Sequence, residues 1–167
     1  NDVLLTALVL ACAEWCRRRG RGAATNALLV DVEGHGREEM WADVDLSRTV
    51  GWFTTLFPVR LDAGSVDIQE AMEGGAALGH ALKRIKEQLH ALPDHGLGYG
   101  LLRYLNEDTA RQLSRFAVPQ IGFNYLGRFA LGGGAWTDSA ETEDLGRIAS
   151  ALPLAHCVEV NARTIED

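Results

Sequence analysis

The feature that most constrains this chain is a largely apolar run, Ala27–Val32, that ends in the charged segment Glu33-Gly-His-Gly-Arg-Glu38. A short run rich in branched apolar residues is typical of a buried strand. Side chains on a strand alternate between its two faces. The ionisable side chains are therefore expected together on the face opposite Val30 and Val32, namely Asp31, Glu33, His35 and Arg37. Such a face is either solvated or part of a functional site.

Composition indicates an ordinary globular chain. Its 167 residues are 47% hydrophobic and 23% charged, enough for one domain or one lobe with a buried core. No apolar segment approaches the roughly 18 residues of a membrane-spanning helix. The formal net charge of -7 argues against nucleic acid as a partner, since nucleic-acid-binding surfaces carry a basic excess. We therefore expect neither a membrane nor a nucleic acid among its partners.

The basic cluster and the cysteines have simple explanations. The arginines of residues 17–21 are expected at the C-terminal end of a helix, in preference to a docking patch for an acidic partner. Cys12, Cys16 and Cys157 form neither a disulfide framework nor a metal-ligand spacing. Buried thiols in a reducing compartment are the expectation, and residues 1–16 lack the flanks of a signal peptide. The predicted location is the cytoplasm.

Helices and strands are predicted to alternate irregularly. Helices are expected over residues 2–19, 66–92, 101–105 and 107–116, and strands over 25–33, 49–61, 119–127 and 152–161. Pro58 should mark a break between strands or an edge position. Residues 130–147 are expected to form an exposed loop. This pattern predicts an α/β fold, a two-layer sandwich in which helices pack on a sheet.

Several side chains are assigned to the core or to turns. The first helix is expected to bury Leu4, Leu8, Ala11 and Trp15, which recur at helical spacing, and Trp52 and Phe53 are expected in the core. The pair Gly74-Gly75 falls inside the long second helix and weakens it. The glycines of residues 96–100 follow a helix and lack a P-loop lysine, so they indicate a tight turn instead of a phosphate-binding loop.

Four segments occur in a characteristic order, and together they span most of the chain. They are Glu33–Glu38, Arg48–Pro58 (RTVGWFTTLFP), Pro93–Gly100 (PDHGLGYG) and Phe123–Phe129 (FNYLGRF). In this order and spacing they resemble the motifs of nonribosomal peptide synthetase epimerization domains, a branch of the condensation-domain superfamily. The EGHGRE segment distinguishes these domains from ordinary condensation domains in the family. Phe57 stands where the family often has tyrosine, and Ala130 where an acidic residue is common.

The resemblance also implies an architecture. The family has two chloramphenicol-acetyltransferase-like lobes, each with helices on a mixed sheet, with the active site in the tunnel between them. Residues 1–167 resemble the C-terminal lobe as a single domain. The HHxxxDG motif of the N-terminal lobe is absent, since no two of the five histidines are adjacent. We therefore expect the isolated lobe to be inactive.

The resemblance implies inversion of the Cα of an aminoacyl or peptidyl thioester held on the phosphopantetheine arm of a carrier protein. Such inversion needs acid/base groups on both faces of Cα and stabilisation of an enolate-like oxyanion. By its match to the motif, Glu33 is expected as one acid/base group, opposite the histidine of the N-terminal lobe. No metal or bound cofactor is implied. Expected partners are a peptidyl carrier protein, the N-terminal lobe and neighbouring synthetase modules.

Other roles stay open at this point. Tyr125 is a candidate hydrogen-bond donor to the enolate, or a core tyrosine, and Asn124 a candidate for binding the substrate or its arm, or a strand-edge amide. His35 and Arg37 either bind the substrate or its arm, or tune Glu33 electrostatically, or only hold the end of the strand. Glu33 itself could be a solvated carboxylate paired with Arg37 or His35. Alternative functions are a condensation or acyl-transfer lobe and a non-catalytic lobe that docks a carrier protein.

Overall fold

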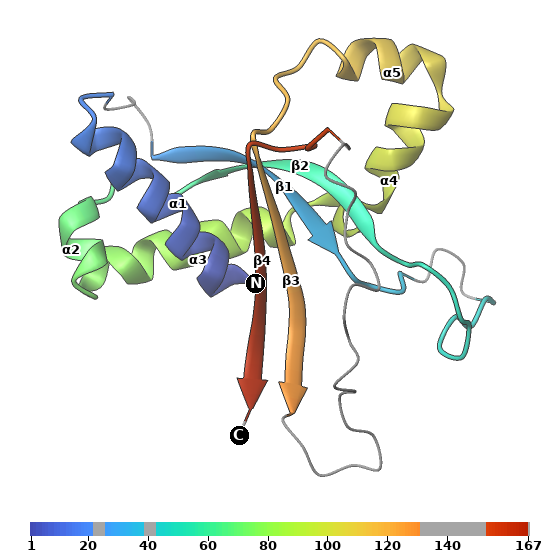
Figure 1. The fold of residues 1–167 in the computed structure, drawn as a ribbon, viewed down its shortest axis with the longest axis horizontal. Coiled ribbons are helices and arrows are strands. Elements are labelled where there is room, and N and C mark those ends of the chain that lie inside the picture. The colour runs from blue at the N-terminus through green and yellow to red at the C-terminus, as the bar shows by residue number, and fades with distance from the viewer. Residues whose placement is uncertain (22–25, 39–42, 131–152, 167) are drawn as a thin grey trace.

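A computed structural model describes residues 1–21, 26–38, 43–130 and 153–166. These residues form helices and one four-stranded sheet (Figure 1). In chain order the elements are α1 (Asp2–Arg18), β1 (Ala27–Gly34), β2 (Thr55–Asp62), α2 (Ile68–Met72), α3 (Ala76–His90), the 3-10 turn η1 (Pro93–Gly96), α4 (Leu97–Gly100), the π-helical turn η2 (Leu101–Leu105), α5 (Glu107–Leu113), β3 (Ile121–Ala130) and β4 (Val158–Glu166).

The sheet is mixed, with strand order β2-β1-β3-β4. Strands β1 and β2 are antiparallel, whereas β1–β3 and β3–β4 are parallel. This confirms the predicted α/β fold with helices on a mixed sheet. Strand β2 lies at an edge and continues through Pro58, which pairs in register with Asp31. Of the two predictions for Pro58, the edge position is correct, because an edge strand tolerates the missing N–H of proline.

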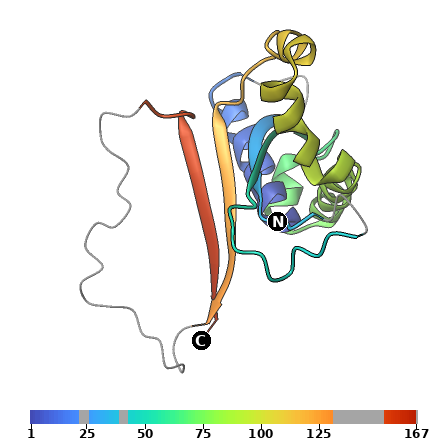
Figure 2. The ribbon, with the colours of Figure 1, turned by 90° about the vertical axis from the view of Figure 1, so that its right-hand side faces the viewer.

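The sheet is joined at its centre by a short seam. Strands β1 and β3 pair in register only at Asp31 with Gly122 and at Val32 with Phe123. Beyond the seam the two pairs of strands diverge, so that β1 and β2 run across the direction of β3 and β4 (Figures 1 and 2). The halves of the sheet therefore share little backbone hydrogen bonding.

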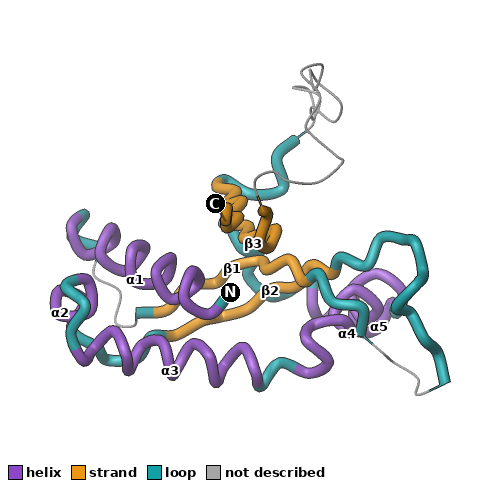
Figure 3. The backbone as a smooth tube through the Cα atoms, turned by 90° about the horizontal axis from the view of Figure 1, so that it is seen from below, coloured by secondary structure: helices purple, strands orange, loops and turns teal. Residues whose placement is uncertain are grey.

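One face of β1 and β2 packs against α1 and α3 to form the core (Figure 3). Our prediction for the buried stripe of α1 is only partly correct: Leu8 packs against the core, whereas Leu4 is 40% and Trp15 53% exposed. The helix is apolar on more than one side, so spacing alone does not select the buried stripe. The core comprises Leu5, Val9 and Leu10 of α1, Val30 and Val32 of β1, Phe57, Val59 and Leu61 of β2, Ala77, Ala81 and Ile85 of α3, and Phe123 of β3, among others.

The C-terminal end of α1 confirms the simple explanation of the arginine cluster. Arg17 and Arg18 lie in the last turn, where cations interact favourably with the helix dipole. Both donate hydrogen bonds to the carboxylate of Glu14. The hydrogen bond from Arg17, followed by that from Arg18, lowers the pKa of Glu14 to about 2.

The long helix predicted over residues 66–92 is two helices. Gly74 has φ +82°, a left-handed conformation that ends α2, and Gly75 is the N-cap of α3. Glycine adopts this conformation readily because it has no Cβ. The glycine pair is therefore the break between two helices, and the prediction of one continuous helix is wrong.

Other local predictions are also corrected. The second strand begins at Thr55, not at residue 49, and Trp52 is 91% exposed instead of buried. Gly98 and Gly100 are helical in α4, so the predicted tight turn is confined to the residues before Leu97. The last strand runs over Val158–Glu166, so it overlaps the predicted span 152–161 but is shifted toward the C-terminus. The predicted loop 130–147 lies almost entirely outside the described residues.

The turn η1 brings the backbone against the core through three left-handed residues. Asp94, His95 and Gly96 have φ values of 45°, 49° and 84°. A Cβ added at Gly96 would overlap the ring of Phe57. Glycine is therefore required at position 96 both by its backbone conformation and by its contact with β2.

We expect Gly96→Ala to destabilise the protein by at least about 2 kcal/mol, because it adds a clash with a buried ring to a left-handed backbone strain. Gly98→Ala is the matched control: Gly98 is helical and an added Cβ meets no atom within 4 Å. It should leave stability unchanged or raise it by up to about 1 kcal/mol. Chemical denaturation of both variants measures the difference. Equal effects would contradict the described geometry of η1.

A buried histidine reinforces the seam. His156, just before β4, lies with its Nε2 2.8 Å from Asp31 Oδ2 and its Nδ1 2.5 Å from Glu159 Oε1. The hydrogen bond with Asp31 is the main cause that raises the pKa of His156, and Glu159 contributes in the same direction. Gly122 of β3 lies against His156 and Glu159, and an added Cβ there would be 2.8 Å from His156 Nδ1. The cluster thus ties β4 to β1 across a β3 residue that has no side chain.

His156→Gln should lower the free energy of unfolding by about 2 kcal/mol near pH 6, less than the roughly 3–5 kcal/mol of breaking a fully buried pair. Because the folded-state pKa of His156 is raised, its stabilisation is complete below the unfolded pKa of about 6.5 and is lost as pH rises through the folded value. Denaturation from pH 6 to 9 should show the wild-type advantage shrinking. His80→Gln, on the exposed side of α3, is the control. A pH-independent difference would argue against a charged His156.

Candidate functional site

The EGHGRE segment lies at the end of β1 and beyond it. Because β1 ends at Gly34, only Asp31 and Glu33 of the four ionisable groups lie on the strand itself. They share a face, since Val30 and Val32, which alternate with them, are buried on the other. His35 and Arg37 belong to the segment that follows, so the predicted strand with four such groups on one face is corrected. The side chains of His35 and Arg37 contact different parts of the structure.

His35 links the segment to β3. Its Nε2 lies 2.7 Å from Asn124 Oδ1, so with the amide oxygen as acceptor the imidazole carries its proton on Nε2. The other ring nitrogen, Nδ1, is 3.4 Å from Thr54 Oγ1, a long hydrogen bond from the residue before β2. Asn124 and Thr54 therefore orient the ring from both sides. The structure brings His35 and Asn124 together as a pair.

Glu33 lies beside this pair but makes no hydrogen bond to it. Its Oε2 is 4.0 Å from His35 Nε2, beyond hydrogen-bonding distance, and its side chain is 34% exposed. Within the described ranges the carboxylate of Glu33 accepts no side-chain hydrogen bond. A carboxylate that is half-buried, next to an oriented imidazole and still accessible can accept and return a proton.

Arg37 points away from Glu33. It donates hydrogen bonds to the carbonyl oxygens of Leu46, at 2.8 Å, and Thr49, and its guanidinium lies 4.5 Å from the centre of the Phe53 ring. These contacts hold the segment that leads into β2. They favour the alternative in which Arg37 supports the local structure, while its proposed contact with the substrate or its arm stays a prediction.

The last residue of the segment reaches the third motif. Glu38 Oε1 lies 3.0 Å from Nδ1 of His95, in the strained turn η1. The EGHGRE segment therefore contacts all three other motifs: Arg48–Pro58 through Arg37 and His35, Pro93–Gly100 through Glu38, and Phe123–Phe129 through His35. Four segments far apart in sequence meet at one end of β1.

Tyr125 is not brought to Glu33. It follows Asn124 in β3 and so lies on the opposite face of the strand, where it packs against the core near Phe123. Its hydroxyl is 2.8 Å from Thr164 Oγ1 of β4. This position favours the core-tyrosine alternative, and a hydrogen bond from Tyr125 to an enolate stays a prediction without support from its location.

Sequence reasoning missed three side chains at or near the site. Thr54 contacts His35, His95 contacts Glu38, and His156 is hydrogen-bonded to Asp31. Thr54 and His95 lie inside two of the four recognised motifs, and that membership was a usable signal. His156 carried none, because it pairs with a residue 125 positions away.

The described residues give no sign of a metal centre or a membrane segment. In the described ranges, no group of three or more His, Cys, Asp or Glu side chains is arranged to hold a metal ion. In the same ranges no helix combines the length and the apolar character needed to cross a bilayer.

Comparison with known proteins gives consistent similarities. The family model described as "Condensation domain" matches residues 1–158. The chain is 49% identical over 142 residues to a linear gramicidin synthase polypeptide of Brevibacillus parabrevis, covering 84% of this chain and 2% of the relative. It is 42% identical over 130 residues to surfactin synthase subunit 1 of Bacillus subtilis (strain 168), covering 77% and 3%.

A solved structure is similar over nearly the whole chain. It is the epimerization domain from the third module of tyrocidine synthetase B, with a TM-score of 0.73 and 32% identity over 99% of this chain and 33% of that one. The chain thus spans one third of that structure and only a few per cent of the curated relatives. From the family match and these similarities together, the chain belongs to the condensation domain family of nonribosomal peptide synthetases.

Proposed function

We propose that this chain is the C-terminal lobe of an epimerization domain. It would invert the Cα of an aminoacyl or peptidyl residue bound as a thioester to the phosphopantetheine arm of a carrier protein. The observation that carries the proposal is the Glu33 carboxylate, half-buried, accessible and held beside the oriented His35–Asn124 pair. The similarity to the tyrocidine synthetase epimerization domain over 99% of the chain supports it.

The proposed reaction has two proton transfers. Glu33 removes the Cα proton, and the electron pair of the broken C–H bond is delocalised into the thioester carbonyl as an enolate-like anion. A proton then returns to the other face of Cα from an acid on the opposite side of the substrate, which we assign to the histidine of an HHxxxDG motif in a partner N-terminal lobe. Glu33 then releases its proton to solvent and the opposite acid takes one up, so both groups are restored and the substrate changes only in configuration.

His35 has a positioning role in this proposal. Its Nε2 proton is engaged by Asn124, at 2.7 Å, so it is not aimed at Glu33. A ring fixed in this way presents a constant dipole beside the carboxylate while the proton moves. Asn124 acts through His35, and a direct contact of Asn124 with the thioester arm stays a prediction.

The second candidate function is condensation, which is compatible with the match to the condensation domain family. A condensation lobe would form an amide between two carrier-bound groups instead of inverting a centre. The two functions differ in their products, because only epimerization exchanges the Cα proton with solvent and leaves the acyl chain length unchanged. Formation of an amide from two loaded carriers, without exchange at Cα, would establish this alternative.

The proposed partners follow from the relatives. Those reported above are named as parts of peptide synthases, and the chain covers only a few per cent of their length. We infer that this lobe works with a peptidyl carrier protein, an N-terminal lobe and neighbouring modules, and that it binds no cofactor beyond the arm that carries its substrate. Its cytoplasmic location stays a prediction.

Glu33→Gln in the full-length protein should slow exchange of the Cα proton with deuterated water by at least about 100-fold, because the amide cannot accept the proton. Mass spectrometry of the residue released from a loaded carrier measures the exchange. Glu87→Gln makes the same chemical change at an exposed position of α3 and should keep the wild-type rate. Wild-type exchange in Glu33→Gln would exclude Glu33 as the base.

A further inference from the structure

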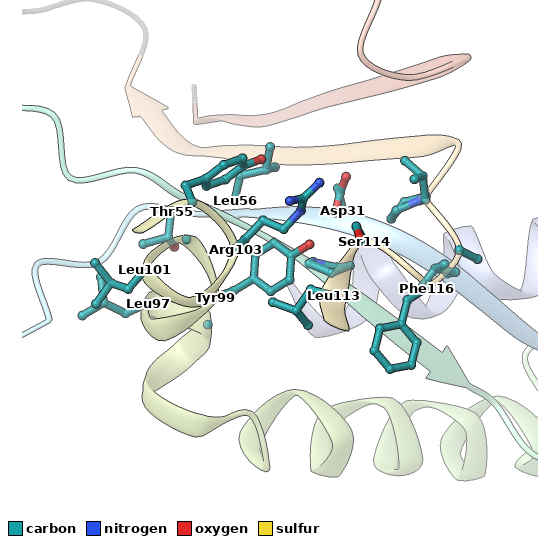
Figure 4. A pocket seen from close by; sticks show the side chains of 18 of the residues that line it. Asp31, Thr55, Leu56, Leu97, Tyr99, Leu101, Arg103, Leu113, Ser114 and Phe116 are labelled. Atoms are coloured by element: carbon teal, nitrogen blue, oxygen red, sulfur yellow. The ribbon is translucent and has the colours of Figure 1, made fainter. Parts of the chain in front are cut away.

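A pocket lies on the same face of β1 as Glu33. Its volume is about 780 Å³, within the roughly 300–1,000 Å³ typical of small-molecule sites. Its floor is formed by β1 and β2 residues that point away from the core, including Leu29 and Leu56, and its walls by α4, η2 and the segment after α5 (Figure 4). Nothing in the roles assigned so far uses this space.

The pocket lies next to Glu33, although Glu33 does not itself line it. Asp31, which lines it, precedes Glu33 by two residues on the same face, a separation of about 7 Å along a strand. Thr54 also lines the pocket and contacts His35. A side chain attached to a Cα beside Glu33 could therefore enter the pocket within its own length.

The lining favours an uncharged, mainly apolar occupant. Leu97 and Leu101 contribute apolar surface from α4 and η2. Burial, together with the nearby carboxylate of Asp31, raises the pKa of Tyr99, so its phenol is neutral around pH 7. Asp31 is paired with His156 at 2.8 Å.

Two arginines that line the pocket, Arg60 and Arg103, also contact other side chains. Arg60 Nη1 lies 3.5 Å from Asp62 Oδ2, and the guanidinium of Arg103 lies 5.5 Å from the centre of the Tyr104 ring. The lining carboxylate, Asp31, is already paired, and Arg103 already interacts with Tyr99 and Tyr104, so a charged side chain would gain little to offset the cost of its desolvation. Apolar contact is the interaction it supplies most.

We propose that this pocket receives the side chain of the residue whose Cα is inverted, and that it selects large, uncharged and mainly apolar side chains. This inference rests on the proposed epimerase function and specifies its substrate class. The pocket holds the side chain while Glu33, about 7 Å along the same strand face, reaches Cα.

The chain offers a matched pair of variants to test the pocket. Gly100 lines it and Gly98 does not, yet both are helical in α4 and an added Cβ at either position meets no atom within 4 Å. Gly100→Leu therefore narrows the pocket, whereas Gly98→Leu adds the same side chain outside it. Cα exchange is measured in the full-length protein on carriers loaded with L-phenylalanine or L-alanine.

Gly100→Leu is expected to slow exchange on the phenylalanine carrier by about 10- to 200-fold relative to the alanine carrier, the range for steric discrimination in an apolar pocket. Gly98→Leu should keep the wild-type ratio. Thermal unfolding checks that both variants fold. If Gly100→Leu does not, Gly100→Ala replaces it, with a smaller change expected in the same direction.

Three results would overturn the inference. Equal effects of Gly100→Leu and Gly98→Leu would show that the pocket is not involved. Equal slowing of both carriers by Gly100→Leu would point to another occupant, such as a segment of the partner lobe. Absence of exchange by the wild-type protein on every carrier would reject the proposed function itself, and this inference with it.

Discussion

The narrow seam between β1 and β3 is the constraint on which the rest of the structure depends. Two register pairs join strands that run in different directions, and two histidines bridge the halves of the sheet beside them. His156 ties Asp31 to the start of β4, and His35 ties the end of β1 to Asn124. Both side-chain contacts supplement the few backbone hydrogen bonds of the seam. The seam also sets where Glu33 lies.

This arrangement explains why a short charged segment can organise so much of the molecule. As β1 leaves the sheet, successive residues of EGHGRE turn toward different elements. His35 faces β3, Arg37 the segment before β2, and Glu38 the turn before α4. Glu33, the first residue, is still on the strand and remains accessible. The side chains that follow act as supports, and the carboxylate they surround keeps its capacity for chemistry.

The two faces of the sheet differ in what they contact. One face packs against α1 and α3 and supplies the buried core, and Phe123 and Tyr125 belong to that side. The other face carries Asp31, Glu33 and Asn124 together with the pocket walled by α4 and η2. Alternation along a strand places the buried apolar side chains on one face and the polar side chains of the site on the other. The same alternation places a pocket for a side chain next to a base for its Cα.

The sequence by itself determined the local features. The first strand, the following strand with Pro58 and the family motifs all rest on signals within a few residues of one another. Short-range patterns of apolar residues, glycine and capping groups are sufficient for such features. The resemblance in the motifs then singled out Glu33 before any geometry was known.

Tertiary structure decided everything that depends on distant partners. It selected Leu5 and Val9 over Leu4 as the buried stripe of α1, exposed Trp52, and turned Tyr125 toward the core. It also paired His156 with Asp31 across 125 residues. A side chain's environment is set by which segments pack against it, and that packing follows from the crossing of the two halves of the sheet. No local pattern in the sequence contains that crossing.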